Sequence, residues 1–399
     1  MNKKIIALGL CVIIICMLVC GCGTNNANEP AGNSNKPQSN KTPATIAAND
    51  SWYAGDNYRD YYLELEILDS YTPDGSEEES WPAAEDVNGD GELDKDIMCY
   101  RIGKKLIIAG NGAGKIMANE DASHMFYTFE KITEIKGLNL LDTSNTTNMY
   151  AMFMSCDSVE EFNLSHFNTE KVTNMDSMFY NCFALTKLNL SSFNTKNVEN
   201  MHDMFNGCKS MTTMDLSSFD TSKVTNLARM FEHCTSLEQI DLSHFNTENV
   251  TSIAVMFHNC RSLKTIDLSN FCFDNIENIN SMFQDCESLV TIDLQNLKGE
   301  KLSALNDMFN GCEALETANL KNLNTANIYE MQFMFSGCKS LKTLLLGELD
   351  TSNVMDMRGV FADCENLTFD ASNWNTEVVY DYQRFNENAP NVTAPTWQN

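Results

Sequence analysis

The sequence predicts an α/β repeat solenoid, because one pattern recurs every 26 residues along most of the chain. Each copy of the pattern carries a cysteine and, three residues before it, a phenylalanine. The cysteines are Cys156, Cys182, Cys208, Cys234, Cys260, Cys286, Cys312, Cys338 and Cys364. Units of this length cannot bury their apolar face alone, so neighbouring units must stack around one continuous core.

Two periodicities alternate inside each unit. Val172, Met175 and Phe179 are spaced three and four residues apart, which places them on one face of a short helix. Leu188 and Leu190 alternate with polar residues, as in a very short strand. We therefore expect each unit to consist of one strand and one helical turn.

Changes in composition divide the chain into five segments. Residues 23–50 are rich in Asn, Ser, Thr, Ala and Pro, and a stretch with Ile46 as its only large apolar residue is expected to stay disordered. Counting an imperfect first unit, we expect about ten turns. The predicted segments are a lipoprotein signal peptide (1–22), a disordered tether (23–50), a small β-rich unit (51–118), the solenoid (119–376) and a C-terminal cap (377–399).

The first residues have the features of a lipoprotein signal. Lys3 and Lys4 precede the apolar run Ile5–Val19, which is too short to span a membrane stably. A small residue, Gly21, stands directly before Cys22, so Cys22 is the predicted lipid acceptor. The sequence thus predicts attachment to the extracellular face of the cell membrane through a lipid anchor alone. Plain secretion with an incidental cysteine is the alternative.

The repeat also resembles a known family. Its unit, M-F-x-x-C-x-x-L-x-x-(L/I)-(D/N)-L-S-x-F-(D/N)-T, is similar to the repeat of the BspA-like leucine-rich-repeat surface proteins of bacteria, over about residues 125–376. The resemblance implies a leucine-rich-repeat solenoid, and the pattern of residues 51–118 separately predicts a small N-terminal β cap. The resemblance further implies a surface-exposed protein, often a lipoprotein, that takes part in adhesion to host matrix or to other cells.

The fifteen cysteines raise the question of disulfides, because the chain is expected to be exported. In a stacked solenoid each repeat cysteine has two equivalent neighbours, and an odd number of them cannot pair completely. We therefore expect a row of buried thiols that act as small apolar side chains.

The acidic composition limits the partners and the function. A formal charge of −28 would repel phosphate, which argues against nucleic-acid binding. None of the six histidines lies in a catalytic motif, so the sequence does not predict an enzyme. We expect a surface binding protein, an adhesin that engages a protein or glycan through the strand face. A passive structural spacer without a specific ligand is the alternative.

One strand position points away from the core in every unit and forms a row of candidate ligand-binding residues. The row contains Asn189, Asp215, Asp241, Asp267 and Asp293. Adjacent carboxylates repel one another and attract cations or basic groups. An equally weighted alternative is that each Asx side chain caps backbone groups at its turn. Phe273, which stands where other repeats have a polar residue, is a further candidate as an exposed anchor, or else repeat variation that packs locally.

The N-terminal unit contains a candidate calcium loop. Its residues are Asp86, Asn88, Asp90, Glu92 and Asp94. Their spacing, with Gly91 at the sixth position, is typical of the start of a calcium-binding loop. Ile97 stands where the bidentate acid should be, so a solvated acidic turn is the alternative.

The same unit has the pattern of a β element. Tyr61–Leu68 alternates as a strand, and Tyr100–Ile108 and Lys115–Met117 flank Gly110-Asn111-Gly112. An Asn-Gly pair between two strands predicts a β-hairpin turn.

Overall fold

The structure is a computed structural model that describes residues 41–53, 59–347 and 349–397. All of these residues belong to one compact unit, Ser39–Asn399. The predicted signal peptide, its acceptor Cys22 and most of the predicted tether lie outside them. Within the described residues, no helix has the length and apolar character needed to cross a membrane.

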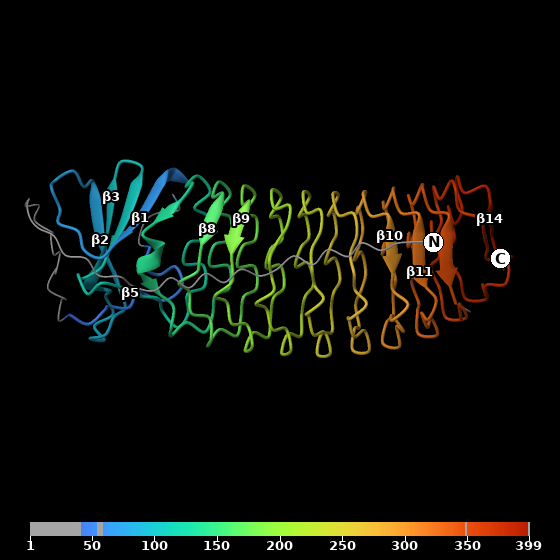
Figure 1. The fold of residues 1–399 in the computed structure, drawn as a ribbon, viewed down its shortest axis with the longest axis horizontal. Coiled ribbons are helices and arrows are strands. Elements are labelled where there is room, and N and C mark those ends of the chain that lie inside the picture. The colour runs from blue at the N-terminus through green and yellow to red at the C-terminus, as the bar shows by residue number, and fades with distance from the viewer. Residues whose placement is uncertain (1–40, 54–58, 348, 398–399) are drawn as a thin grey trace, which may run out of the picture. The chain divides into compact units, whose positions relative to one another are not determined.

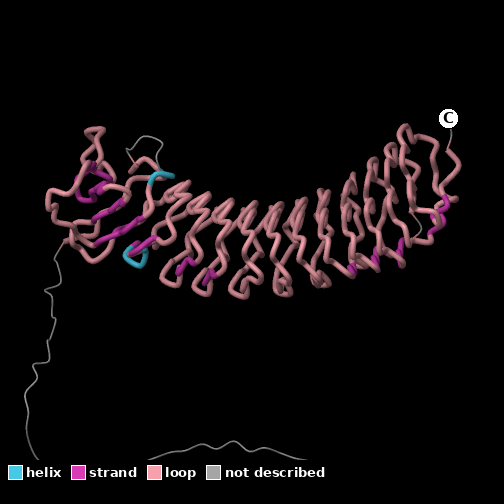
Figure 2. The backbone as a smooth tube through the Cα atoms, turned by 90° about the horizontal axis from the view of Figure 1, so that it is seen from above, coloured by secondary structure: helices cyan, strands magenta, loops and turns pink. Residues whose placement is uncertain are grey.

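The repeats stack side by side in sequence order (Figure 1). Single parallel bridges join equivalent asparagines of successive repeats, from Asn148 to Asn174, to Asn200 and to Asn226. A second row consists of short parallel strands, and Figure 2 shows these along the outer edge of the curved stack. The strands are β8 (Glu161–Asn163), β9 (Lys187–Asn189), β10 (Thr291–Asp293), β11 (Thr317–Leu320), β12 (Thr343–Leu346), β13 (Phe369–Asp370) and β14 (Val392–Thr393). A repeat fold is therefore confirmed.

The predicted helical turn is wrong. The segment 172–182 is a series of turns in which Ser177 and Asn181 have left-handed backbone, with φ of 56° and 59°. Alternate amides donate to the next repeat, as the Phe179 N–H does to the Met204 carbonyl at 2.9 Å. The described residues hold only two 3-10 helices, η1 (Arg59–Tyr61) and η2 (Leu138–Leu140).

Phenylalanine rings fill the centre of the stack. Neighbouring rings of the phenylalanine row, such as Phe231 and Phe257, lie 5.4–5.9 Å apart between centroids and within 13° of parallel. From Phe153 to Phe361 these rings are fully buried. The 26-residue period places each ring over the next, so the apolar core is continuous from repeat to repeat.

The repeat cysteines lie beside the phenylalanines as buried, free thiols, which confirms the prediction of their burial. Each thiol contacts the backbone of the preceding repeat: Cys234 Sγ donates to the Phe205 carbonyl oxygen at 3.2 Å. Burial raises the pKa of the Cys234 thiol to about 12. These cysteines are therefore packing groups with a weak donor, and their thiolate forms are disfavoured.

The N-terminal unit is a five-stranded sheet in the order β2-β3-β4-β1-β6. Its strands are β1 (Glu64–Leu68), β2 (Glu79–Ala84), β3 (Asp94–Ile102), β4 (Lys105–Ala109) and β6 (Ile135–Lys136). Because β6 comes from the first imperfect repeat and pairs with β1, the sheet and the repeats share one core.

The predicted Asn-Gly hairpin is also wrong. The tight turn of this sheet is at Gly103 and Lys104, between the antiparallel strands β3 and β4. The glycine-rich segment instead bends against Asp69, whose backbone carbonyl accepts the Gly112 N–H at 2.8 Å. It leads to β5 (Ile116–Met117), which pairs with the parallel strand β7 (Leu141–Asp142).

The boundary of the tether is corrected as well. Ile46 is 1% exposed, and bridges join Thr45 to Met117 and Ile46 to Ala84. Ala47 is buried too, and the backbone amides of Ile46 and Ala47 donate to the carbonyl groups of Met117 and Ala83, each at 2.9 Å. Residues 41–50 of the predicted tether are thus part of the folded unit. At the other end, the Tyr382 and Trp397 rings stack at 4.4 Å beside the last repeat.

Candidate binding face

The predicted row of ligand-binding residues lies on the row of short strands. Asn189 is in β9 and Asp293 is in β10, while Asp215, Asp241 and Asp267 occupy the equivalent place in the three repeats between them. All five side chains are exposed. The repeat thus brings them into one row on the outer edge of the stack.

Each member of the row also caps its own turn. The Oδ1 atoms of Asp241 and Asp267 accept the N–H groups of Ser243 and Ser269, each at 2.9 Å. These bonds lower the pKa of both carboxyl groups, so both are ionised at neutral pH. The capping and the ligand-facing hypotheses are compatible, because capping uses one oxygen and the side chain stays exposed.

Strand pairing differs along the row. β8 pairs with β9, and β10 pairs with β11 and β12, but no strand is assigned in the three described repeats that carry Asp215, Asp241 and Asp267 (Figure 1). At the edge of this gap the Asn319 amide donates to Asp293 Oδ1 at 2.9 Å, which relieves the charge there. Repulsion between successive carboxylates is a physical reason for the looser pairing in the gap.

A shallow groove of about 530 Å³ runs across the same repeats. Its apolar lining residues are half-buried, and its polar lining residues, among them Asp241 and Asp267, are exposed. The groove is lined by Thr213, Met214, Gln239, Ile240, Asp241, Thr265, Ile266 and Asp267. The chain therefore offers an acidic groove with half-buried apolar side chains at the centre of the strand row.

Phe273 is not exposed. Its side chain is 3% accessible and lies 6.0 Å from the Phe271 ring between centroids. The structure thus contradicts the hypothesis that Phe273 is an exposed anchor and supports the alternative, repeat variation that packs locally. The residue at this position faces inward in other repeats too, where Thr221 and Thr247 are buried, so a larger apolar side chain was accommodated in the core.

The predicted calcium loop connects β2 and β3 and is exposed. Its own backbone occupies the candidate ligands: Asp86 accepts the N–H groups of Gly89 and Gly91 at 2.7 and 2.8 Å. The Asp94 carboxylate accepts the Asn88 amide at 2.9 Å, so these two candidate ligands also bond to each other within the loop. Calcium binding by Asp86, Asn88, Asp90, Glu92 and Asp94 stays a prediction.

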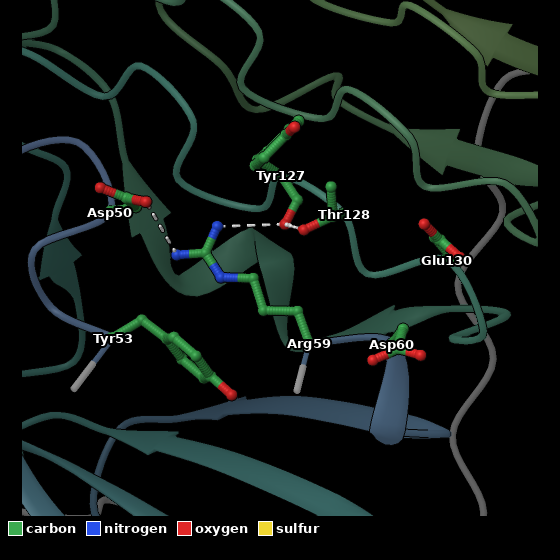
Figure 3. Close-up of a pocket in the computed structure, with 7 residues that line it drawn as sticks. All are labelled: Asp50, Tyr53, Arg59, Asp60, Tyr127, Thr128 and Glu130. Carbon is green, nitrogen blue, oxygen red and sulfur yellow. Dashed lines mark hydrogen bonds and ion pairs between the residues drawn. The ribbon is translucent and has the colours of Figure 1, made fainter. Parts of the chain in front are cut away.

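The pocket in Figure 3 surrounds Arg59, whose contacts serve a structural role. Arg59 Nη1 donates to the Tyr127 carbonyl at 3.1 Å, and Nη2 lies 3.5 Å from Asp50 Oδ2. The guanidinium carbon also lies 4.7 Å from the centre of the Tyr53 ring. Arg59 thus joins the N-terminal segment to the first repeat.

A polar cluster in the turns of two adjacent repeats was not predicted from the sequence. Glu232, His233 and His258 lie in adjacent repeats, and their ligand atoms all lie within 4.8 Å of one another. The sequence did hold a clue, because Glu232-His233 precedes Cys234 and His258-Asn259 precedes Cys260, in equivalent positions one repeat apart.

Comparison of the sequence with protein families finds one family, described as "Mycoplasma protein of unknown function, DUF285". Its model matches three successive, slightly overlapping segments, 120–215, 210–318 and 303–398, which together span the repeats. The chain belongs to this family. No curated protein matches the sequence.

Solved structures with some similarity include two named as leucine-rich repeat proteins. The one from Eubacterium ventriosum is 14% identical over 77% of this chain and 96% of its own, with a TM-score of 0.36. The one from Leptospira interrogans is 12% identical over 73% and 78%, with a TM-score of 0.24. A complex of TLR13 with single-stranded RNA is 17% identical over 72% of this chain but 40% of its own, with a TM-score of 0.30. Scores this low support no inference about ligands.

Proposed function

We propose that this protein is a non-catalytic binding protein of the bacterial cell surface, of the BspA-like leucine-rich-repeat type. It is held at the membrane by a lipid on Cys22 and engages a partner through the acidic groove of the strand row. The partner is a protein or glycan surface that presents basic groups around an apolar contact. The groove at Asp241 and Asp267 is the observation that carries this proposal.

Charge and shape support this choice of surface. The Asp215, Asp241 and Asp267 carboxylates are exposed and ionised, so they favour cationic partners and raise association rates at low salt. Half-buried Met214, Ile240 and Ile266 line the groove and leave apolar surface that a partner can desolvate. An apolar residue followed by an aspartate recurs in three successive repeats, which suits a partner that makes the same contacts more than once.

The double variant D241N/D267N tests the groove directly. We expect it to bind at least tenfold more weakly than the native protein, because two ionic contacts are lost while the Asn oxygens can still cap their turns. Binding of the purified protein to separately immobilised extracellular-matrix proteins is measured by surface plasmon resonance at low and physiological salt.

A matched control for that experiment is D220N/D350N. These aspartates are also exposed and also accept the N–H of the serine two residues on, at 2.9 Å each, but they lie outside the strand row. The control should bind as the native protein does. Equal losses in both variants would show a dependence on net charge and not on the groove.

Lipid attachment at Cys22 has its own test. A Cys22→Ser variant expressed in a lipoprotein-exporting bacterium should not incorporate radiolabelled palmitate and should pass from the membrane fraction to the medium, because the acyl chains are the only proposed anchor. Cys20→Ser should keep both label and membrane attachment. Labelling that persists in the Cys22 variant and disappears in the Cys20 variant would contradict the assignment.

A further inference from the structure

Three potential metal ligands converge between two adjacent repeats. Glu232 and His233 come from the turns of one repeat, and His258 comes from the equivalent place in the next. The Glu232 side chain is 7% exposed, whereas the His258 and His233 side chains are 22% and 41% exposed. The cluster therefore has a buried carboxylate beneath two imidazoles that solvent can reach.

The spacing of the ligand atoms suits a tetrahedral ion. Glu232 Oε1 lies 3.0 Å from His258 Nδ1 and 3.5 Å from His233 Nε2. A tetrahedral ion with bonds of about 2.0–2.1 Å places its ligand atoms about 3.4 Å apart. One carboxylate oxygen thus lies at about the right distance from both imidazole nitrogens. All three ligand atoms lie within 4.8 Å of one another, so side-chain rotation has to bring the two imidazoles closer together around an ion.

Neighbouring side chains fix the carboxylate so that this oxygen faces the histidines. Glu232 Oε2 accepts the Asn206 amide at 2.8 Å and lies 3.1 Å from Arg229 Nη1. Oε1 receives neither of these contacts. On the far side of the His258 ring, Nε2 lies 3.5 Å from Asp285 Oδ2. A carboxylate behind a metal-binding imidazole holds its proton on the outer nitrogen and leaves the inner one free for the ion.

His233 must change its tautomer to bind an ion. Its Nδ1 contacts the Asn259 amide nitrogen at 2.7 Å, and Arg261 Nε donates to Asn259 Oδ1 at 2.6 Å. This arrangement leaves the proton on Nε2, where it points toward Glu232. Metal binding moves the His233 proton to Nδ1 and requires Asn259 to turn its oxygen toward that proton.

We propose that Glu232, His233 and His258 bind one divalent transition-metal ion, Zn²⁺ in the exported protein, with a fourth position open to solvent or to a partner's side chain. Two imidazoles and one carboxylate favour such an ion over calcium or magnesium, which prefer oxygen ligands. Because the ligands belong to adjacent repeats, the bound ion links these repeats directly.

Cobalt titration of the metal-free, full-length protein tests the site. Tetrahedral Co²⁺ with nitrogen and oxygen ligands absorbs visible light, so the spectrum reports both binding and coordination. We expect one Co²⁺ per chain, displaced by Zn²⁺ and retained in excess Ca²⁺. H258Q and H233Q should each weaken binding at least tenfold. Because the His233 side chain is the more exposed of the two, H233Q still tests the site if H258Q misfolds.

H202Q is the matched control, because His202 also lies against carboxylates, 2.9 Å from Asp203 Oδ2 and 3.6 Å from Asp176 Oδ1, but has no second imidazole in that cluster. It should bind cobalt as the native protein does. The proposal would be overturned by a lack of stoichiometric binding, by H233Q and H258Q binding cobalt as tightly as the native protein, or by a thiolate charge-transfer band. X-ray absorption of the zinc form should show two imidazole ligands and no sulfur.

Discussion

Replacing Phe257 with alanine should lower the free energy of unfolding by about 3–5 kcal/mol, the usual cost of a large cavity in a packed core. The Phe257 ring is fully buried and stacks between Phe231 and Phe283, at centroid distances of 5.5 and 5.6 Å. Neighbouring repeats cannot collapse into the cavity without breaking the register of the whole stack. Urea unfolding followed by far-UV circular dichroism measures the effect.

Tyr329→Ala is the control for this prediction, because the Tyr329 side chain is 46% exposed and makes no part of the ring stack. It should change stability by less than about 0.5 kcal/mol. Repeat arrays can unfold in more than one step. The dependence of the unfolding free energy on urea concentration should therefore also be compared between the two variants. A loss below about 1 kcal/mol for Phe257→Ala would contradict a continuous core.

The second large effect is expected at Thr221. This buried side chain both accepts the Asn246 N–H at 2.8 Å and donates to the Asn246 carbonyl at 2.9 Å. Thr221→Val keeps the shape but leaves two backbone groups of the next repeat without partners. Since each unpaired group costs about 1–3 kcal/mol when buried, we expect a loss of about 2–4 kcal/mol in the same urea experiment.

Thr221→Ser separates the hydroxyl from the methyl group. It keeps both hydrogen bonds and should cost less than half as much as Thr221→Val. The same pair of contacts recurs at Thr169, Thr195 and Thr247, so Thr195→Val should behave similarly. If the serine and valine variants were equally destabilised, packing and not hydrogen bonding would explain the buried threonines.

The repeat could be predicted from the sequence because its period depends only on which residues are apolar. Burial of Phe179 and Cys182 and the exposed place of Asp241 all follow from that pattern. The helical turn did not follow, because spacings of three and four residues fit a helix and this turn series equally well. Left-handed residues at Ser177 and Asn181 and hydrogen bonds to the next repeat decide between them.

The candidate sites depended on contacts that one repeat cannot reveal. The row of Asp215, Asp241 and Asp267 was visible because its members are one period apart. The cluster of Glu232, His233 and His258 was not, because Glu232 and His258 share one repeat position but differ in residue type, so the repeat pattern does not mark them as a site. For Phe273 the sequence left an exposed anchor and local packing open, because the equivalent Thr residues are polar and yet are themselves buried hydrogen-bonding groups.

Hydrogen–deuterium exchange with and without a bound matrix protein tests the binding face most directly. Protection of the amides around 213–215, 239–241 and 265–267, reduced in D241N/D267N, is the result we expect from a partner seated in the acidic groove. Two results would contradict a binding face at the acidic groove. One is protection confined to the turn segments of the repeats or to the N-terminal sheet, and the other is a lack of saturable binding to every matrix protein tested.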